Sequence, residues 1–209
     1  MLEPIILASQ SPRRRQLLEW AEIDFDVVVP VTDESYPDGL PPEEVPVYIA
    51  RQKALAVQDQ LNNNPTIPGL DIDPTERSAF VAGIRRRTIL AADTVVVLGN
   101  EIIGKPRDRD DAIAILTRLS GREHQVITGV CCRRASAEVT FADVTRVQFH
   151  ALTPGQIAFY VDKYRPYDKA GAYAIQEWIG VVGIKSVNGD FYNVMGLPVS
   201  RAVRALAGM

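Results

Sequence analysis

The sequence is poor in the residue types that most often carry nucleophilic or metal-binding chemistry, because its 209 residues include two cysteines and two histidines. Cys131 and Cys132 are adjacent within a predicted strand, so they cannot easily close a loop and lack the spacing of zinc ligands. We expect them to be packing residues in a reducing compartment. His124 and His150 have no cysteine, serine or acidic partner at motif spacing, which argues against a catalytic triad or a histidine-based metal site.

Long apolar runs and a strong net charge are also absent. No segment approaches the roughly 20 apolar residues that span a bilayer, and the N-terminus lacks the regions of a signal peptide, so we expect a cytoplasmic protein. The chain has 23 Lys and Arg against 26 Asp and Glu. Such a mildly acidic chain without a basic tail argues against nucleic acid as the main partner. Any chemistry is therefore expected to rest on carboxylates, lysines, arginines and a metal.

The first chemical signal lies between Ile5 and Leu18, a stretch with the pattern of a short buried strand, a polar turn and a helix. Ser11 is a favourable N-cap and Pro12 suits the first helical turn. Ser9, the free backbone amides and the arginines at positions 13–15 would then converge on one point. Free N–H groups at a helix N-terminus favour anions and arginine grips them bidentately, which predicts a phosphate site. The alternative is an ordinary capped surface helix with solvated arginines.

A carboxylate interrupts the most hydrophobic strand that the sequence predicts, over residues 88–98. Burying Asp93 there without partners is costly, so it requires strong hydrogen bonds, a cation or a metal, and it is a functional candidate. In the alternative, the strand ends before Asp93, which then only caps a turn. Gly99-Asn100 has the residues of a tight hairpin, which would return the chain with Lys105 near Asp93.

A second pair of carboxylates, Asp33 and Glu34, follows a strand predicted over 25–29. Acidic pairs in loops are usually only solvated, so this pair has two interpretations. The three- and four-residue spacing of small apolar residues over 47–61 predicts a helix that carries Lys53. Lys53 could face either solvent or an anion.

The segment Asp168 to Gln176 packs small residues between a charged pair, Asp168-Lys169, and a glutamine. Small residues let a backbone approach a ligand closely, and glutamine offers both a donor and an acceptor to the edge of a base. We therefore expect this segment to line a ligand site.

Periodicity and turn residues predict the remaining elements. An irregular insertion is expected at about 62–87, and the other expected elements are helices over 108–119, 154–161 and 199–206, strands over 125–133, 138–149 and 181–187, and a hairpin at Asn188-Gly189 returning through 190–194.

These motifs, in this order and from residue 5 to about 205, resemble the Maf family of nucleotide pyrophosphatases. The matching segments are Leu7–Arg14, Ala92–Val96, Gly104–Pro106, Leu119–Gly121, Thr128–Val130, Asp168–Tyr173 and Met195–Pro198. The resemblance implies one α/β domain over 1–209 of the Maf and inosine triphosphate pyrophosphatase type, in which helices flank an elongated mixed sheet and a cleft separates two lobes. The insertion at about 62–87 is longer than the usual connection in the family.

The resemblance also implies an activity, the hydrolysis of nucleoside triphosphates between the α and β phosphates with a divalent metal, Mg²⁺ or Mn²⁺, commonly by a homodimer. By position, Asp93 matches the catalytic acidic residue and Glu34 a second metal ligand beside it. Whether Asp93 is a base or a metal ligand is left open. The residues that the resemblance places in substrate binding are Ser9, Arg13, Arg14, Lys53, Thr94, Lys105, Lys169 and Gln176.

Three of these positions, Arg13, Thr94 and Gln176, resemble those that separate substrate groups within the family. The branch that acts on dTTP and UTP carries this combination, whereas the 7-methyl-GTP branch tends to carry tryptophan, glutamine and glutamate. An uncharged amide at Gln176 can serve the alternating acceptors and donor of uracil or thymine. The sequence therefore favours a dTTP and UTP pyrophosphatase. The alternatives are a 7-methyl-GTP pyrophosphatase, a non-catalytic nucleotide-sensing regulator of cell division, and a phosphatase that releases orthophosphate.

Overall fold

The computed structural model describes residues 2–63, 83 and 86–209. These residues form a seven-stranded mixed sheet in the order β2-β1-β3-β5-β6-β7, and β4 also pairs with β3. β1 is parallel to β2 and to β3, and the other pairs are antiparallel. The strands are β1 (Ile5–Leu7), β2 (Phe25–Val27), β3 (Ile89–Leu98), β4 (Glu101–Ile103), β5 (Glu123–Arg134), β6 (Ala137–Phe149) and β7 (Ile184–Asn188).

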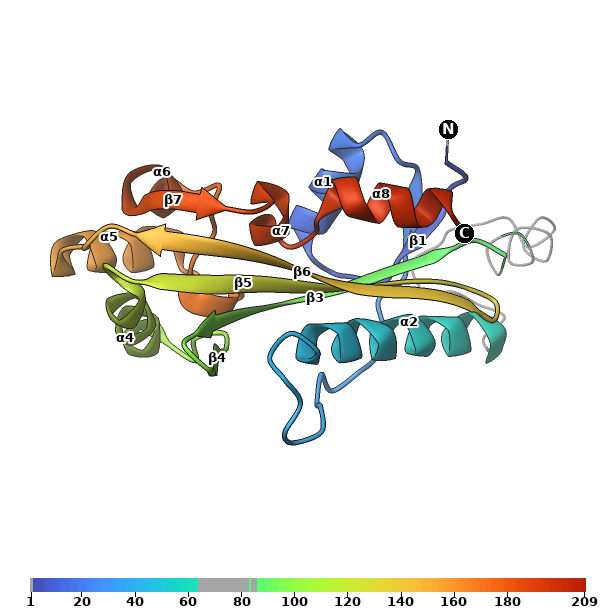
Figure 1. Ribbon diagram of the computed structural model, residues 1–209, viewed down its shortest axis with the longest axis horizontal. Coiled ribbons are helices and arrows are strands. Elements are labelled where there is room, and N and C mark those ends of the chain that lie inside the picture. The colour runs from blue at the N-terminus through green and yellow to red at the C-terminus, as the bar shows by residue number, and fades with distance from the viewer. Residues whose placement is uncertain (1, 64–82, 84–85) are drawn as a thin grey trace.

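Helices cover both faces of this sheet, as Figure 1 shows. The helices are α1 (Pro12–Trp20), α2 (Val45–Asn63), α4 (Arg109–Leu119), α5 (Pro154–Tyr164), α6 (Trp178–Gly183), α7 (Phe191–Met195), α8 (Val199–Ala207) and a 3₁₀ turn, η1 (Ala170–Ala172). α2 lies along one face, α1, α7 and α8 lie on the other, and α4 and α5 lie together at one end of the long strands (Figure 1). The predicted fold class, an elongated mixed sheet flanked by helices, is confirmed. None of the described helices is long and apolar enough to cross a bilayer.

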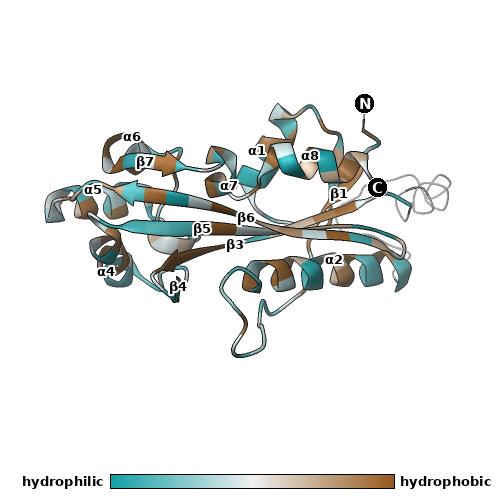
Figure 2. Ribbon diagram, in the orientation of Figure 1, coloured by the Kyte–Doolittle hydropathy of each residue, from teal (hydrophilic) through white to brown (hydrophobic). Residues whose placement is uncertain are grey.

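The side chains of β3 alternate between two hydrophobic clusters, as the period of a strand requires. Leu90 and Ala92 belong to the cluster under α1, α4, α5 and α8. Ile89 and Ala91 point the other way and pack with residues of α2. The buried positions of α2 include Ala50, Ala54, Val57 and Leu61, at steps of four, three and four residues. Figure 2 shows hydrophobic and hydrophilic residues alternating along this helix, which is the pattern of a helix with one buried face.

The strand predicted over 181–187 is only partly correct. Its first half belongs to α6, and β7 begins at Ile184. The β-branched Val181 and Val182 suggested a strand, yet both are exposed here, and β propensity yields readily to tertiary context. Gly180 permits the helix, because a Cβ there would lie 1.7 Å from the carbonyl oxygen of Ile175.

The hairpin return predicted over 190–194 is wrong. Asp190 caps α7 instead, and its side chain accepts the backbone N–H of Tyr192 at 2.7 Å. Asn188 and Gly189 favour a turn whether a strand or a helix follows. Asp190 is also a favourable N-cap, so the chain can continue from this turn into a helix. Of the insertion predicted at about 62–87, residues 62 and 63 complete α2, and most of the remainder lies outside the described residues.

We expect Gly129→Ala to destabilise the protein by about 1–3 kcal/mol, because overpacking of a close contact forces backbone shifts. Gly129 lies in β5 under the start of α2, where an added Cβ would lie 2.1 Å from the backbone nitrogen of Val47 and 2.2 Å from the carbonyl carbon of Pro46. The measurement is the free energy of unfolding in urea. Gly104→Ala is the control, since no described atom lies within 4 Å of a Cβ at that site. Equal stability of the two variants would contradict the close packing of α2 on β5.

Candidate active site

A cavity of about 470 Å³ opens at the edge of β3 that faces β1 and β4. β1 pairs with β3 only as far as Leu90, and β4 begins its pairing at Val96, which leaves the edge between them free for a ligand. A cavity at this break can be reached from both faces of the sheet. It is lined by every residue that the sequence proposed for the site: Ser9, Arg13, Arg14, Glu34, Lys53, Asp93, Thr94, Lys105, Lys169 and Gln176.

On the α2 face of β3, an ammonium group lies between two carboxylates. Lys53 Nζ is 2.7 Å from Asp93 Oδ1 and 2.6 Å from Glu34 Oε1. Lys105 Nζ is 3.7 Å from Glu34 Oε2. The sequence left open whether Lys53 faces solvent or an anion. Lys53 is buried and faces carboxylates. Asp93 lies within the strand, so the alternative that the strand ends before it is wrong.

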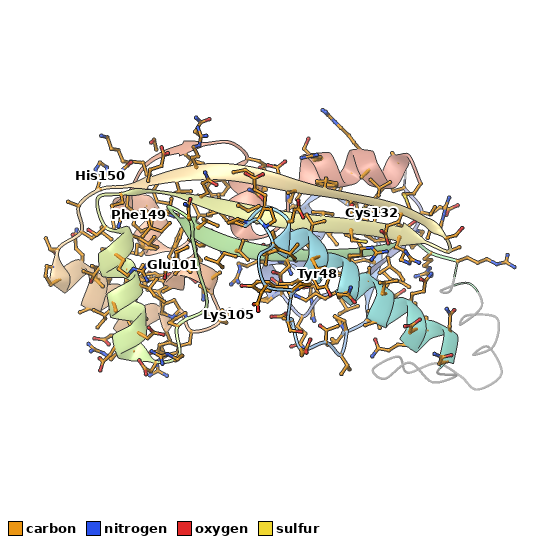
Figure 3. The ribbon with its side chains drawn as sticks, turned by 60° about the horizontal axis from the view of Figure 1, so that its bottom comes forward. Tyr48, Glu101, Lys105, Cys132, Phe149 and His150 are labelled. Atoms are coloured by element: carbon orange, nitrogen blue, oxygen red, sulfur yellow. The ribbon has the colours of Figure 1, made fainter. Side chains whose placement is uncertain are left out.

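Lys105 lies on the loop that follows β4, as the hairpin predicted. In Figure 3 it is labelled between α4 and α2, on the side of the sheet that α2 covers. Lys105 contacts Glu34, which together with Asp93 holds the Lys53 ammonium. Lys105 is therefore near Asp93, as expected, but its ion pair is with Glu34.

Glu34 is held in an uncommon backbone conformation, with φ of 55°. A left-handed conformation is costly for a residue with a Cβ and is found where the surrounding structure determines it, frequently at functional sites. The side chain is partly buried, which raises its pKa, but the hydrogen bond from Lys53 and the charges of Lys53, Lys105 and Arg14 outweigh burial, so the pKa of Glu34 is lowered. Glu34 is thus an anion at neutral pH, and the interpretation of it as a merely solvated loop residue is not supported.

On the opposite face of β3, Arg14 is buried and donates to three uncharged oxygen atoms. Its Nε donates to the Gly196 carbonyl at 2.8 Å, one Nη to Ser9 Oγ at 3.2 Å and the other to Thr94 Oγ1 at 3.1 Å. Burial lowers the pKa of Arg14, against the charge of Asp93, which raises it. Because a guanidinium has five N–H donors, two remain for a ligand within the described part of the chain. A buried cation with neutral neighbours is a favourable site for an anion.

The turn before α1 differs in one detail from the prediction. Ser11 occupies the N-cap position, but its side chain makes no capping hydrogen bond. Its backbone N–H instead donates to Ser9 Oγ at 3.2 Å. Ser9 therefore organises the turn and orients Arg14, and one of the amides expected to bind an anion is already occupied.

The segment around η1 forms the remaining wall of the cavity. Gly171, with φ of 70°, packs so closely on β3 that a Cβ would lie 2.9 Å from Val96 Cγ2. Asp168 accepts from Arg13 at 3.3 Å and from the buried Lys169 at 2.8 Å. Gln176 is exposed at the cavity wall, as expected for a residue that meets a ligand.

Sequence reasoning missed two residues behind this wall, Glu177 and Tyr160. Glu177 Oε1 lies 3.6 Å from Lys169 Nζ, and the Tyr160 hydroxyl donates to the same carboxylate. Tyr160 also accepts the backbone N–H of Ala174 at 3.2 Å. The signal available in the sequence was weak, since Tyr160 only falls within the helix predicted over 154–161. Together these residues fix Lys169 and the backbone that leads to Gln176.

Neither the two histidines nor the two cysteines are among the residues that line the cavity. His124 is buried, its Nε2 lies 2.8 Å from the Tyr173 hydroxyl, and burial lowers its pKa to about 4. Burial raises the pKa of Cys131 and of Cys132 to about 12, so neither is a thiolate at neutral pH.

The donors at Glu34 and Asp93 fit a divalent metal only together with oxygen atoms from a substrate. The described residues contain no cluster of three or more His, Cys, Asp or Glu side chains that could hold a metal alone. Mg²⁺, however, is commonly held by one or two carboxylates plus substrate phosphates. One oxygen of Glu34 and one of Asp93 already face the Lys53 ammonium, which leaves the second oxygen of each carboxylate for a metal.

Known proteins resemble this chain over nearly its whole length. The sequence profile of the Maf-like protein family matches residues 4–209. The chain belongs to the Maf-like family. A relative from Bacteroides fragilis, named dTTP/UTP pyrophosphatase, is 45% identical over 203 residues, which cover 97% of this chain and 94% of the relative.

Two further relatives carry the same name. The protein from Parabacteroides distasonis is 44% identical over 97% of this chain and 94% of its own length. The protein from Porphyromonas gingivalis is 45% identical over 93% of this chain and 88% of its own length. The resemblance found in the sequence motifs is confirmed at the level of the family.

We expect the stability of the protein to fall more steeply in acid than that of a Glu34→Gln variant. The folded-state pKa of Glu34 lies below its ordinary value of 4.5, so the charged carboxylate stabilises the folded state above that value. This contribution is lost as the pH falls through the folded-state pKa. The measurement is the urea midpoint of both proteins between about pH 6 and about pH 3. Parallel curves would show that the contact between Glu34 and Lys53 does not form in solution.

Proposed function

We propose that this protein hydrolyses dTTP and UTP to the nucleoside monophosphate and pyrophosphate, as a control on the nucleotide pool. The observation that carries the proposal is the single cavity in which an ammonium–carboxylate cluster on one face of β3 meets an arginine-rich wall on the other. The names of the relatives support the choice of dTTP and UTP. In the reaction, water attacks phosphorus, the bond to the bridging oxygen between the α and β phosphates breaks, and that oxygen leaves with one of the products.

Asp93 is the residue best placed to activate the attacking water. Its Oδ1 is held by Lys53, which keeps the carboxylate in a fixed orientation in the cavity wall. It acts either as the base that accepts the proton of the water or as a ligand of the metal. Glu34 and Asp93 would hold a bound Mg²⁺ or Mn²⁺, which would neutralise phosphate charge and lower the pKa of a bound water.

The cations of the cavity provide the rest of the phosphate site. Arg14 contributes its two remaining N–H groups, and Lys105, which is half-exposed, contributes an ammonium that contacts only Glu34 in the described residues. Gln176 offers an amide to the base. The homodimer and the cytoplasmic location implied by the sequence stay predictions.

The direct test supplies the purified protein with Mg²⁺ or Mn²⁺ and a panel of dTTP, UTP, CTP, ATP, GTP and 7-methyl-GTP. We expect pyrophosphate and the monophosphate from dTTP and UTP, at a higher kcat/KM than from the purine nucleotides. Orthophosphate as the first product would instead indicate a phosphatase. Binding without turnover would indicate a nucleotide sensor, and a preference for 7-methyl-GTP would place the chain in the other substrate group.

Asp93→Asn should lower kcat by about 10²–10⁴-fold, the range for loss of a general base. The amide keeps the size of the side chain but neither accepts a proton at neutral pH nor attracts a metal. Asp162→Asn is the matched control, because Asp162 pairs with Arg109 on the surface at 2.6 Å, away from the cavity lining. Near-normal turnover by a folded Asp93→Asn protein would move the chemistry to another carboxylate, with Glu34 the next candidate.

Lys105→Ala and Gln176→Glu should separate the phosphate end of the substrate from the base end. Loss of the Lys105 ammonium should weaken UTP and GTP alike, by about 1.5–3 kcal/mol for a charged hydrogen bond. Gln176→Glu should penalise UTP selectively, because a carboxylate cannot donate to a carbonyl of uracil. The measurement is kcat/KM for both nucleotides in both variants. A base-selective loss at Lys105, or an equal loss at Gln176, would reverse the proposed orientation.

A further inference from the structure

A single tyrosine hydroxyl holds both ends of the turn that leads from the cavity wall into α6. The Tyr160 oxygen accepts the backbone N–H of Ala174 at 3.2 Å, and its proton is donated to Glu177 Oε2. The backbone N–H of Glu177 closes the turn by donating to the carbonyl of Ala174 at 3.1 Å. Tyr160 itself is fully buried in α5. The position of Glu177 relative to α5 is therefore fixed through both its backbone and its side chain.

The groups that take part determine the direction of these hydrogen bonds. A backbone amide only donates, so the Tyr160 oxygen must accept from Ala174, and its one proton is left for the carboxylate of Glu177. Burial and the Glu177 carboxylate raise the pKa of Tyr160, so the phenol keeps this proton at neutral pH. Oε2 of Glu177 is thus bound by Tyr160, and the other oxygen, Oε1, lies 3.6 Å from Lys169 Nζ.

Glu177 is an uncommon residue for the place that it occupies in the chain. It is the N-cap of α6, where short polar side chains are preferred because they accept a backbone N–H of the first turn. The Glu177 side chain makes no such capping hydrogen bond. Its greater length instead lets the carboxylate reach from the turn to both Tyr160 and Lys169. A glutamate at this position therefore serves the contact with Lys169 rather than the helix cap.

Lys169 is the member of this cluster that meets the cavity. Its side chain is buried and is among the residues that line the cavity, whereas Tyr160 and Glu177 are not among them. Asp168 accepts one of its three N–H groups at 2.8 Å. A lysine side chain loses much conformational freedom when it is fixed, so an ammonium that is already held in place binds an anion at lower cost.

We propose that Tyr160 is a positioning residue for substrate binding, which acts through Glu177 to hold the Lys169 ammonium at the cavity wall. Tyr160 contacts no substrate itself. Without its hydroxyl, the Glu177 carboxylate loses the donor that orients it, and Lys169 has to be ordered by the incoming nucleotide. The cost then falls on binding rather than on the chemical step. This inference rests on the proposed function, because it takes the cavity as the nucleotide site.

The test replaces Tyr160 by phenylalanine, which keeps the ring and every charge of the site. Tyr160→Phe should raise KM for UTP by about tenfold and change kcat by less than about twofold, since loss of a contact that supports only binding appears in KM. A general loosening of the fold would instead lower the active fraction, and with it kcat, at an unchanged KM. Unchanged KM in a folded Tyr160→Phe protein would overturn the proposal.

Tyr164→Phe is the matched control. Tyr164 lies on the same helix, its ring stacks on that of Tyr160 with centroids 5.0 Å apart, and it is not among the residues that line the cavity. The variant loses a tyrosine hydroxyl but keeps the hydrogen bond between Tyr160 and Glu177, so both kinetic constants should stay at the wild-type values. A rise in KM as large as that of Tyr160→Phe would show that any change in this helix has the effect, which overturns the proposal.

Two further variants show whether the effect passes through Glu177 and Lys169. Glu177→Asp keeps the charge but withdraws the carboxylate by one methylene, so it should raise KM for UTP to a similar extent, and it serves as the test if Tyr160→Phe does not fold. In a Lys169→Ala protein, neither change should alter KM by more than about twofold, because the group that they position is gone. An equal rise in KM with and without Lys169 would overturn the proposal, as would an unchanged KM in Lys169→Ala itself.

Binding of the two products separates this inference from the proposed function. The Kd of UMP and of pyrophosphate, measured by calorimetry, requires no turnover, and Tyr160→Phe should weaken the binding of whichever product Lys169→Ala weakens. Pyrophosphate release from UTP by the wild type, with the wild-type KM in folded Tyr160→Phe and Glu177→Asp proteins, overturns the role of Tyr160 and leaves the activity intact. No pyrophosphate from UTP, with the same product bound more weakly by Tyr160→Phe and Lys169→Ala, overturns the activity and supports the role of Tyr160. Absence of both turnover and product binding overturns both.

Discussion

The ion pair between Lys53 and Asp93 is the interaction on which the rest of the site depends. Asp93 interrupts a strand that is otherwise buried, and an uncompensated carboxylate there would cost several kcal/mol. Its cation must come from α2, which can approach only because Gly129 lies directly across the strand pair from Asp93. The start of α2 occupies the space that a side chain at Gly129 would fill. Because Gly129 of β5 has no Cβ, α2 can pack close to the sheet and place Lys53 over the Asp93 carboxylate of β3.

A break in the strand pairing of β3 makes the ion pair between Lys53 and Asp93 accessible to a ligand. β1 ends its pairing at Leu90 and β4 begins at Val96, so a ligand in the gap can touch side chains from both faces of the same strand. Asp93 and Thr94 are consecutive and point in opposite directions, yet both line the cavity. This geometry keeps the carboxylates apart from the buried guanidinium of Arg14, although the two kinds of group serve one ligand. A fully paired β3 would separate them into two unrelated surfaces.

Much of this arrangement could be predicted from local sequence. Asp93 stood out because its charge conflicts with the hydrophobic residues around it, and the Gly99-Asn100 turn correctly returned Lys105 toward the site. Capping residues and periodicity located most helices, whereas α6 and α7 were missed because β-branched residues and an Asn-Gly pair fit two structures equally well. The direction of Lys53 could not be predicted, since it depends on how a helix packs on a sheet.

The side-chain contacts that the sequence did not reveal join residues that are distant along the chain. Thr128 meets Thr94 and Asn193 across 34 and 65 positions, and Tyr160 meets Glu177 across 17. Nothing in the local pattern marks a threonine in a hydrophobic strand as part of a hydrogen-bond chain. Such residues can be recognised only once the register of β3 with β5 and the position of α7 are known.

The two faces of the cavity differ in how firmly they are held, and this difference suits two tasks. On the α2 face, the side chains of Glu34 and Lys105 are 44% and 58% exposed, so water competes for their contacts and they can adjust as phosphate charge enters and leaves. On the other face, hydrogen bonds link Arg14, Thr94, Thr128 and Asn193, of which Arg14, Thr128 and Asn193 are buried. Hydrogen bonds between buried groups are not exchanged for bonds to water, so they hold one geometry. The firmly held face can orient a ligand, whereas the exposed side chains can adjust while a triphosphate, a transition state and two products occupy the cavity in turn.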